Sequence, residues 1–168
     1  MTTLMTHHHD GALAVFLIGA RINKFWRPDA WVPTYAAMGP MLAELHRTPE
    51  TGFLGARTTF GLRGPTVIQY WRSVEDIYRY ANDDDLAHRP AWIEFHRRAR
   101  KAPGAVGIWH ETYAVGAGGH ESLYGDMPPF GLARATTPVP AQHKGRTARE
   151  RLRASGSPRT PPPTPQPR

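Results

Sequence analysis

Two histidines are the residues of this chain best suited to proton transfer. An imidazole has an unperturbed pKa of about 6.5, so His88 and His110 could act at neutral pH as a general base or as a neutral metal ligand. His88 shares a helical stripe with Trp92 and Phe95, which predicts that it faces a sheet. The alternative is a histidine at the edge of the core that hydrogen-bonds a carbonyl or a neighbouring acid.

Glu111 follows His110 directly, and the two together suggest an acid and base pair. They lie in a predicted strand, however, and neighbouring strand residues point to opposite faces of a sheet. Only one of them can therefore be catalytic, and the pattern leaves open which face the helices cover. A buried Glu111 is expected to pair with Arg21, Arg72 or a partner subunit.

Further polar and aromatic residues could hold a substrate. Arg21 and Asn23 lie where the first predicted strand ends and could orient a carbonyl or steady an anion, although hydrogen bonding at a strand end is the simpler role. Gln69 interrupts an otherwise apolar strand and is a candidate for substrate binding. Aromatic side chains could form a flat apolar pocket or plain core; the candidates are Trp71, Trp92, Trp109 and Tyr113.

The elements that must position these residues follow from the periodicity. Alternating or continuously apolar runs predict strands, and apolar residues at intervals of three or four predict helices. Ser73 is a suitable N-cap, with Asp76 three residues later. The predicted order is strand 13–22, a helix that begins at 28, is kinked or split at 39–40 and is ended by Pro49, strands 53–63 and 66–72, helix 74–101 with a break near 83–85, and strand 105–115. This order predicts an α+β, ferredoxin-like βαββαβ fold.

Both faces of the predicted sheet are apolar. The first strand offers Val15 and Leu17 to one face and Phe16 and Ile18 to the other. Helices in this fold cover one face only, so a monomer would expose the other. We therefore expect a symmetric homodimer in which a second copy covers that face.

The chain is expected to hold one domain with extensions. We expect a flexible N-terminus at 1–10, the ferredoxin-like domain at 11–134 and a disordered, basic, Pro-rich tail at 135–168. From residue 135 there are seven Lys and Arg against one Glu, so seven minus one places six of the +7 net charges in the tail. The domain is then almost neutral, and we expect no specific nucleic-acid partner.

The absence of cysteine excludes disulfides and thiolate chemistry. The longest apolar run, 12–20, is too short to span a membrane, so a cytoplasmic protein without a membrane partner is expected. The triplet His7, His8 and His9 is a weak metal candidate because nothing in the sequence orders it.

Several segments carry a resemblance to a known family. The chain is similar over 12–132 to the monooxygenase-like family that includes the fumagillin-cluster monooxygenase, within the dimeric α+β barrel superfamily. The matching segments are 15–24, 69–76, 88–92, 107–113 and 124–132. The Pro128 and Pro129 pair in the last of these predicts an extended arm that lies on the core or on a partner subunit.

The resemblance implies a monooxygenase-like enzyme that acts on a small to medium hydrophobic organic molecule. We expect no cofactor, with His88 or His110 removing a proton and Arg21, Asn23 or an aromatic donor steadying the resulting anion. One alternative is a haem-binding protein or haem enzyme similar to aldoxime dehydratases, with a histidine as axial ligand. Another is a dimeric ligand-binding module without catalytic activity.

Overall fold

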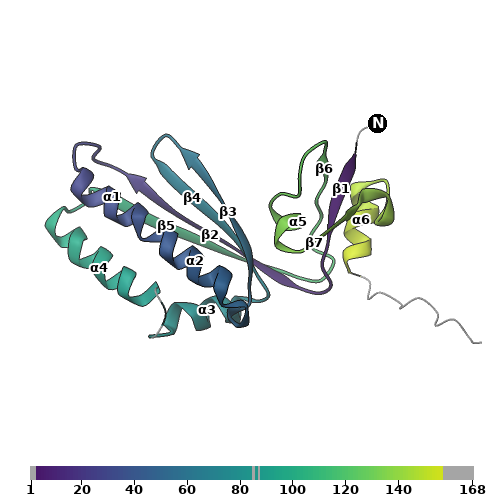
Figure 1. Ribbon diagram of the computed structural model, residues 1–168, viewed down its shortest axis with the longest axis horizontal. Helices are drawn as coiled ribbons and strands as arrows, with labels where there is room; N and C mark the ends of the chain where they lie inside the picture. Colours follow the sequence, from purple (N-terminus) through teal and green to yellow (C-terminus); the bar gives the residue numbers. More distant parts are fainter. Residues whose placement is uncertain (1–2, 85, 87, 157–168) are drawn as a thin grey trace, which may run out of the picture.

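The computed structural model describes residues 3–84, 86 and 88–156 and shows a larger and a smaller unit (Figure 1). The larger unit contains β2 (Leu13–Ile22), α1 (Pro28–Ala36), α2 (Met38–Arg47), η1 (Pro49–Thr51), β3 (Phe53–Gly61), β4 (Gly64–Trp71), α3 (Val74–Asn82), α4 (His88–Lys101) and β5 (Val106–Val115). The remaining elements are β1 (Leu4–His8), β6 (Tyr124–Gly125), α5 (Leu132–Ala135), β7 (Thr137–Pro140), η2 (Ala141–His143) and α6 (Ala148–Ser155).

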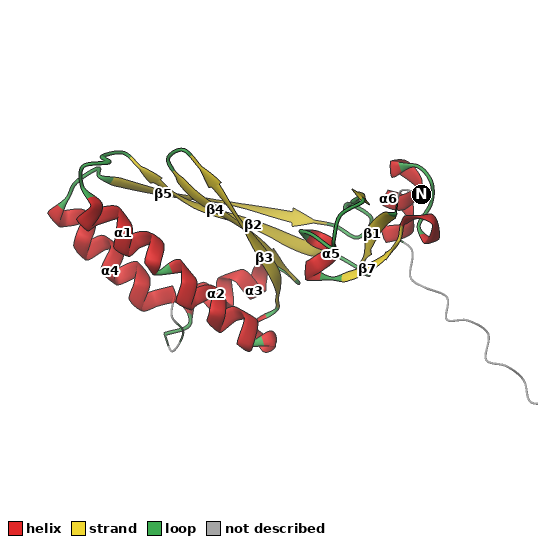
Figure 2. Ribbon diagram, turned by 45° about the horizontal axis from the view of Figure 1, so that its top comes forward, coloured by secondary structure: helices red, strands yellow, loops and turns green. Residues whose placement is uncertain are grey.

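The larger sheet has the strand order β3-β4-β2-β5, and every neighbouring pair is antiparallel. Helices α1 to α4 lie along one side of this sheet (Figure 2). The first and third strands of the βαββαβ unit are thus central, which confirms the predicted ferredoxin-like fold. Strands β3 and β4 form a hairpin, whereas β2 pairs with the distant β5 and so brings residues near 18 beside residues near 110.

Local sequence explains where the helices begin and end. The Ser73 hydroxyl accepts a hydrogen bond from the Asp76 amide at 3.0 Å, as the predicted N-cap requires. The expected kink between α1 and α2 falls at Ala37 rather than at Gly39 and Pro40. Pro40 lies in the first turn of α2, where a missing amide proton costs no helical hydrogen bond.

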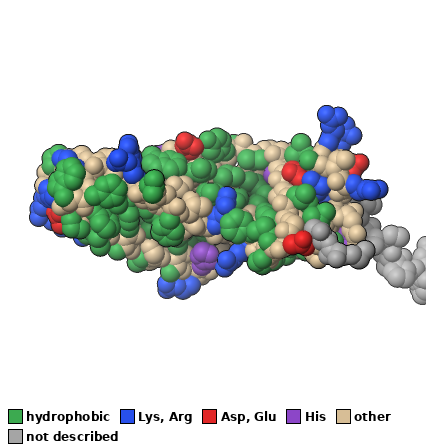
Figure 3. Space-filling view, turned by 90° about the horizontal axis from the view of Figure 1, so that it is seen from above, with side chains coloured by type: hydrophobic (Ala, Val, Ile, Leu, Met, Phe, Trp, Pro, Cys, Tyr) green, Lys and Arg blue, Asp and Glu red, His purple; other side chains and the backbone are tan. Residues whose placement is uncertain are grey.

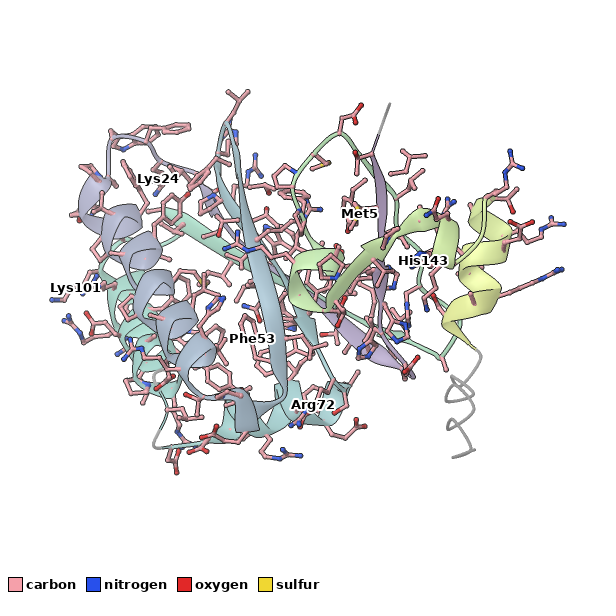
Figure 4. All side chains as sticks on the ribbon, turned by 45° about the vertical axis from the view of Figure 1, so that its right-hand side comes forward. Met5, Lys24, Phe53, Arg72, Lys101 and His143 are labelled. Atoms are coloured by element: carbon pink, nitrogen blue, oxygen red, sulfur yellow. The ribbon has the colours of Figure 1, made fainter. Side chains whose placement is uncertain are left out.

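The core between the helices and the sheet is aromatic. Phe53 lies among the side chains of this core (Figure 4). It packs edge-on against Trp71, and Trp71 contacts Tyr80, with ring centroids 5.3 and 5.8 Å apart. Ala14, Leu45 and Ile77 complete this cluster. The Tyr80 hydroxyl donates to Glu44 at 3.0 Å, and burial raises the pKa of Tyr80, so the phenol stays protonated at neutral pH.

The second face of the sheet is partly covered by the chain itself. Leu132 of α5 packs against Leu13 and Tyr70, and the Arg57 guanidinium lies 4.9 Å from the ring centroid of Phe130. The segment 124–132 therefore lies on the core of its own chain, with a short strand at its start and a helix after it. Hydrophobic side chains gather on the surface of the half that holds the large sheet (Figure 3).

The expectation of a flexible N-terminus at 1–10 is wrong for the described part. Strand β1 pairs with β6 through Met5 and Tyr124 and with β7 across four residue pairs, giving a sheet of order β6-β1-β7. The pairing partners come from the far end of the chain, so no local pattern around residues 4–8 announces this strand. Figure 1 shows β1 and β7 side by side, away from helices α1 to α4.

The expectation of a disordered tail from residue 135 is also wrong up to residue 156. Thr147 and Glu150 form a capping box at the start of α6. Arg151 is buried and donates through Nε to Glu121 at 2.6 Å, which fixes α6 to the preceding chain. Paired charges and capping bonds thus order a segment that has little apolar surface to bury. The rest of the predicted tail, 157–168, lies outside the described residues.

A chain of hydrogen bonds orders the histidine triplet. His7 is buried, and its ring nitrogens lie 2.7 Å from Ser122 Oγ and 2.7 Å from His120 Nδ1. His120 Nε2 lies 3.0 Å from the Gly11 carbonyl, which can only accept, so His120 carries its proton on Nε2. His7 consequently donates through Nε2 and accepts from Ser122 through Nδ1.

Within the part of the chain that the structure describes, no helix combines the length and apolar character that crossing a membrane requires.

Candidate active site

A cavity of about 360 Å³ lies between the helix-covered face of the large sheet and helices α1 to α4. Its volume falls in the range of small-molecule sites, roughly 300 to 1,000 Å³. Its walls are mostly apolar, and the residues that line it include Phe16, Ile18, Ala20, Tyr35, Met38, Met41, Val67, Tyr78, Trp92, Glu94, Phe95, Arg98, Ile108, His110 and Thr112.

The alternation of β5 decides which of its residues reach the cavity. Ile108, His110 and Thr112 line it, whereas Trp109, Glu111 and Tyr113 do not. Side chains of consecutive strand residues point to opposite faces, so the second set lies on the outer face of the sheet. This settles the question that the sequence left open: His110 is on the helix-covered side.

His110 has a free imidazole in an apolar setting. Its ring centroid lies 5.6 Å from that of Phe16, the neighbouring residue on the same face of β2. Within the described residues, neither ring nitrogen hydrogen-bonds to another group. β5 is an edge strand, and the His110 side chain stays exposed on the cavity side. The ring can therefore exchange protons with a ligand or with water.

Tyr35 closes the end of the cavity near α1. Its hydroxyl donates to the Arg63 carbonyl at 3.1 Å, and burial raises the pKa of Tyr35, so this group is a neutral phenol at pH 7. Gly64 is required beside it: it has φ +144°, and a Cβ there would lie on the Tyr35 hydroxyl and the Ala20 carbonyl. Tyr35 is thus fixed by the backbone around it.

Helix α4 supplies the aromatic and charged wall. Trp92 stacks on Phe95 with centroids 6.0 Å apart, and both line the cavity. Between them in the sequence, Glu94 accepts hydrogen bonds from Arg97 and Arg98, and these lower the Glu94 pKa to about 2. Glu94 is therefore ionised at neutral pH and is not a proton donor for the site.

The structure places the other predicted site residues as follows. His88 begins α4, but its side chain lies outside the described part of the structure. Gln69 and Trp71 are on the helix-covered face but are buried in the core, where the Trp71 indole donates to Gln69 Oε1 at 2.9 Å. Neither lines the cavity, so their predicted role in substrate binding is corrected to a structural one.

The outer face and the strand ends hold the remainder. Arg21 pairs with Gly107 in register, on the same face as Trp109, and Asn23 lies beyond the end of β2. Trp109 and Tyr113 project from the outer face. None of the four lines the cavity. Arg21 and Asn23 therefore do not lie beside His110, and Trp109 and Tyr113 do not offer surface to a substrate in the cavity. Within one chain Glu111 is exposed and accepts from the Tyr113 hydroxyl at 2.7 Å, rather than from Arg21 or Arg72. Its expected pairing with a partner subunit stays a prediction.

Tyr35 and Arg98 are cavity residues that the sequence reading missed. Arg98 follows Phe95 by three residues and Ala91 by seven, which is the spacing of one helical face. A helical face drawn through Ala91 as well as Trp92 also contains Arg98. Tyr35 lies in the predicted helix that begins at residue 28 but was not among the candidate site residues.

The model of the family described as "Monooxygenase af470-like" matches residues 13–132. The chain belongs to this family. The matched residues hold the large sheet, its helices, the cavity and the segment that reaches α5, so the family's common part includes the whole candidate site. The resemblance noted in the sequence is thereby confirmed.

A curated relative in this monooxygenase af470-like family is monooxygenase af470 from Aspergillus fumigatus. The two are 31% identical over 137 residues, which is 77% of this chain and 48% of that protein. The chain thus spans about half the length of the curated relative it matches.

Solved structures with a similar fold are more distant in sequence. A conserved protein of unknown function from Bacteroides thetaiotaomicron, described as a possible oxidoreductase, has a TM-score of 0.43 and 10% identity, covering 63% of this chain and 99% of its own. An antibiotic biosynthesis monooxygenase assigned by similarity, from Chloroflexus aurantiacus, has a TM-score of 0.39 and 14% identity, covering 60% and 90%. Likeness of this extent says nothing of the reaction.

Metal and cofactor ligands can be assessed from the side chains. Among residues 3–84, 86 and 88–156, no cluster of three or more His, Cys, Asp or Glu side chains is arranged to hold a metal ion. His110 is the one histidine with a described side chain that lines the cavity, so a haem bound there would need His110 as its axial ligand.

Proposed function

We propose that this protein is a monooxygenase-like enzyme that oxidises a small to medium hydrophobic organic molecule in the cavity, without a bound cofactor. The observation that carries the proposal is the free imidazole of His110 in a mostly apolar cavity, in a chain that belongs to a monooxygenase-like family. A base held beside a bound substrate can remove an acidic proton directly, because substrate and imidazole are already positioned for the transfer.

The proposed reaction begins with transfer of a proton from an activated C–H or O–H group of the substrate to His110. The resulting carbanion or phenolate is rich in electrons and reacts with dioxygen, which accepts them and forms a C–O bond. The proton returns from His110 to give a hydroperoxide. Loss of water from that hydroperoxide leaves a C=O group, so one oxygen atom enters the product and the other leaves as water.

The cavity supports this chemistry through shape and polarity. Phe16, Met38 and Trp92 offer apolar and aromatic surface to a flat substrate, and the cavity volume of about 360 Å³ suits a molecule of two or three rings. Arg21 and Asn23 have no part in this proposal, since they lie away from the cavity. His88 remains a second candidate base from its predicted stripe.

A homodimer is part of the proposal. On the outer face, α5 covers the part of the sheet around Leu13 and Tyr70, but Leu17 and Ile68 are only half buried and Trp109 is exposed. A second copy seated on this uncovered part would remove that apolar surface from water. A cytoplasmic location stays a prediction from the absence of cysteine.

The test is oxygen consumption with apolar phenols, anthrones and enolisable ketones, first selected by binding to the protein. The proposal expects uptake of one dioxygen per product formed and its loss in His110→Gln. Bound ligands that never support oxygen uptake would show a ligand-binding module instead.

A further inference from the structure

Arg98 is the one Lys or Arg among the described residues that line the cavity. It also borders a small neighbouring cavity with Ala30, Thr34 and Ala102, so its side chain runs along the seam between α1 and α4. About a third of the side chain, 33%, is exposed. A guanidinium at this place is partly withdrawn from water and faces an apolar space, where it interacts with an anion more strongly than a fully exposed cation does.

The charges around Arg98 do not cancel. Arg97 uses Nε and Nη2 to bind both carboxylate oxygens of Glu94, each at 2.6 Å. Arg98 adds only its Nε, at 2.5 Å from one of the same oxygens. Two cations therefore share one carboxylate, which leaves one net positive charge at the wall of the cavity.

The terminal amino groups of Arg98 are available. Within the described residues they donate no hydrogen bond, because the contact with Glu94 is made through Nε alone. A guanidinium has five N–H donors in a planar fork, so four remain to meet a carboxylate, sulfonate, phenolate or enolate. Arg97 differs in both respects: it binds Glu94 in bidentate fashion and does not line the cavity.

We propose that Arg98 anchors the substrate and that the substrate class is a compact apolar molecule bearing one anionic group, or one acidic group that ionises in the cavity. This inference deepens and rests on the proposed function. It assigns the two charged tasks to different elements: His110 of β5 takes the proton, and Arg98 of α4 holds the oxygen anion that remains. The apolar walls between them fix the ring system.

Two fluorescent probes of matched shape test the inference with the intact protein. Anilinonaphthalene sulfonate carries an anionic group, and phenylnaphthylamine is the same ring system without it. Both are titrated into the wild-type protein and into Arg98→Met, Arg98→Lys, Arg97→Met and Thr112→Phe, after circular dichroism shows that each variant is folded. Thr112 is exposed and lines the cavity, so a phenyl ring there fills the space without disturbing the core.

Arg98→Met is expected to weaken sulfonate binding by about tenfold or more, since a hydrogen bond to a charged group is lost, and to leave phenylnaphthylamine nearly unchanged. Arg98→Lys should retain part of the preference. Arg97→Met removes the same charge from outside the cavity and leaves Glu94 to Arg98 alone, so it should weaken sulfonate binding clearly less than Arg98→Met does. Thr112→Phe should weaken both probes.

Equal sulfonate affinity in Arg98→Met and wild type, with both probes weakened by Thr112→Phe, would overturn the role of Arg98 and leave the cavity as the site. Equal losses of sulfonate affinity in Arg97→Met and Arg98→Met would also overturn it, because the positive charge of the helix would then explain binding without a direct contact to Arg98. If Thr112→Phe changes neither probe, the probes do not use the cavity, and the proposed function falls with the anchor.

Discussion

His110 and Phe16 face each other across two neighbouring strands, with ring centroids 5.6 Å apart, and both line the cavity under the helices. The contact joins a titratable ring to an apolar one at the floor of the site. The contact is diagonal, since the register pairs His110 with Ile18; Glu111 and Leu17, the next residues in sequence, pair directly and lie on the opposite face. The two faces of the same strand pair therefore have different roles: one lines the candidate active site, and the other belongs to the candidate subunit interface.

Replacing His110 tests the proposed base. His110→Gln keeps a polar group of similar size but cannot accept and return a proton at neutral pH, so oxygen uptake on a bound substrate should fall by about a hundredfold or more. Phenylnaphthylamine affinity should stay close to that of the wild type. His46→Gln serves as the control, because His46 bonds the Leu42 carbonyl on α2 and does not line the cavity. Unchanged uptake in His110→Gln would transfer the role of base to another residue.

Gly19 is expected to tolerate no side chain while Trp109 stays in place. A Cβ at residue 19 would lie 2.5 Å from the Trp109 ring, so Gly19→Ala must displace the indole. We expect a loss of about 1 to 2 kcal/mol in the free energy of unfolding, measured with urea. Gly116→Ala is the control: nothing lies within 4 Å of its Cβ, so the free energy of unfolding should change by less than about 0.5 kcal/mol. Two variants of equal stability would contradict the packing of Trp109.

The buried His7 should make stability depend on pH. Desolvation lowers its pKa from 6.5 to about 4, so the unfolded chain binds more protons than the folded chain between these values. Stability is then full above pH 6.5 and is lost as the pH falls toward 4, by on the order of 3 kcal/mol for one group. Urea midpoints measured between pH 7 and pH 4 should show this slope.

The His7→Gln variant isolates that contribution. It should be less stable than the wild type at pH 7 but should lose less on acidification, since the remaining groups set its slope. A wild-type slope in His7→Gln would show that another group is responsible.

The uncovered part of the outer face should govern self-association. Leu17 points to this face, so Leu17→Lys would place a charge in the proposed interface and should raise the dissociation constant by at least about tenfold in sedimentation equilibrium. Leu62→Lys is the control, because Leu62 is 99% exposed at the β3–β4 turn. A wild-type protein that sediments as a monomer at micromolar concentration would contradict the homodimer.

An absorption spectrum separates the proposed cofactor-free enzyme from a haem protein. After expression with haem supplied, the protein is expected to remain colourless. A Soret band that disappears in His110→Gln would favour the haem alternative, with His110 as the axial ligand.

Local patterns were enough to predict the larger unit. The continuous apolar run of β2, the Ser73 cap and the alternation of β5 fixed element types and order without any tertiary information. They also showed that His110 and Glu111 diverge. Which of the two meets the helices depends on how the strands pack against α3 and α4, and neighbouring residues in the sequence do not encode that packing.

The smaller unit could not be predicted in the same way. Strand β1 is held by partners more than a hundred residues away, and His7 is buried because Ser122 and His120 satisfy it. The composition of residues 135–156 predicted disorder. The spacing of Thr147 and Glu150, however, is that of a capping box, and this pattern in the sequence indicates the start of α6. Gln69 was expected to bind substrate because a polar residue in an apolar strand suggests a ligand contact. Its partner is instead the Trp71 indole, and the sequence does not show that the two side chains bond to each other.

The central claim is that an apolar ligand binds beside His110 under the helices. Following the ring signals of the histidines by NMR during titration with phenylnaphthylamine tests it most directly. The account predicts a saturable shift of the His110 signals, with those of His9 and His46 unmoved. Saturation of the protein with probe while the His110 signals stay in place would contradict it.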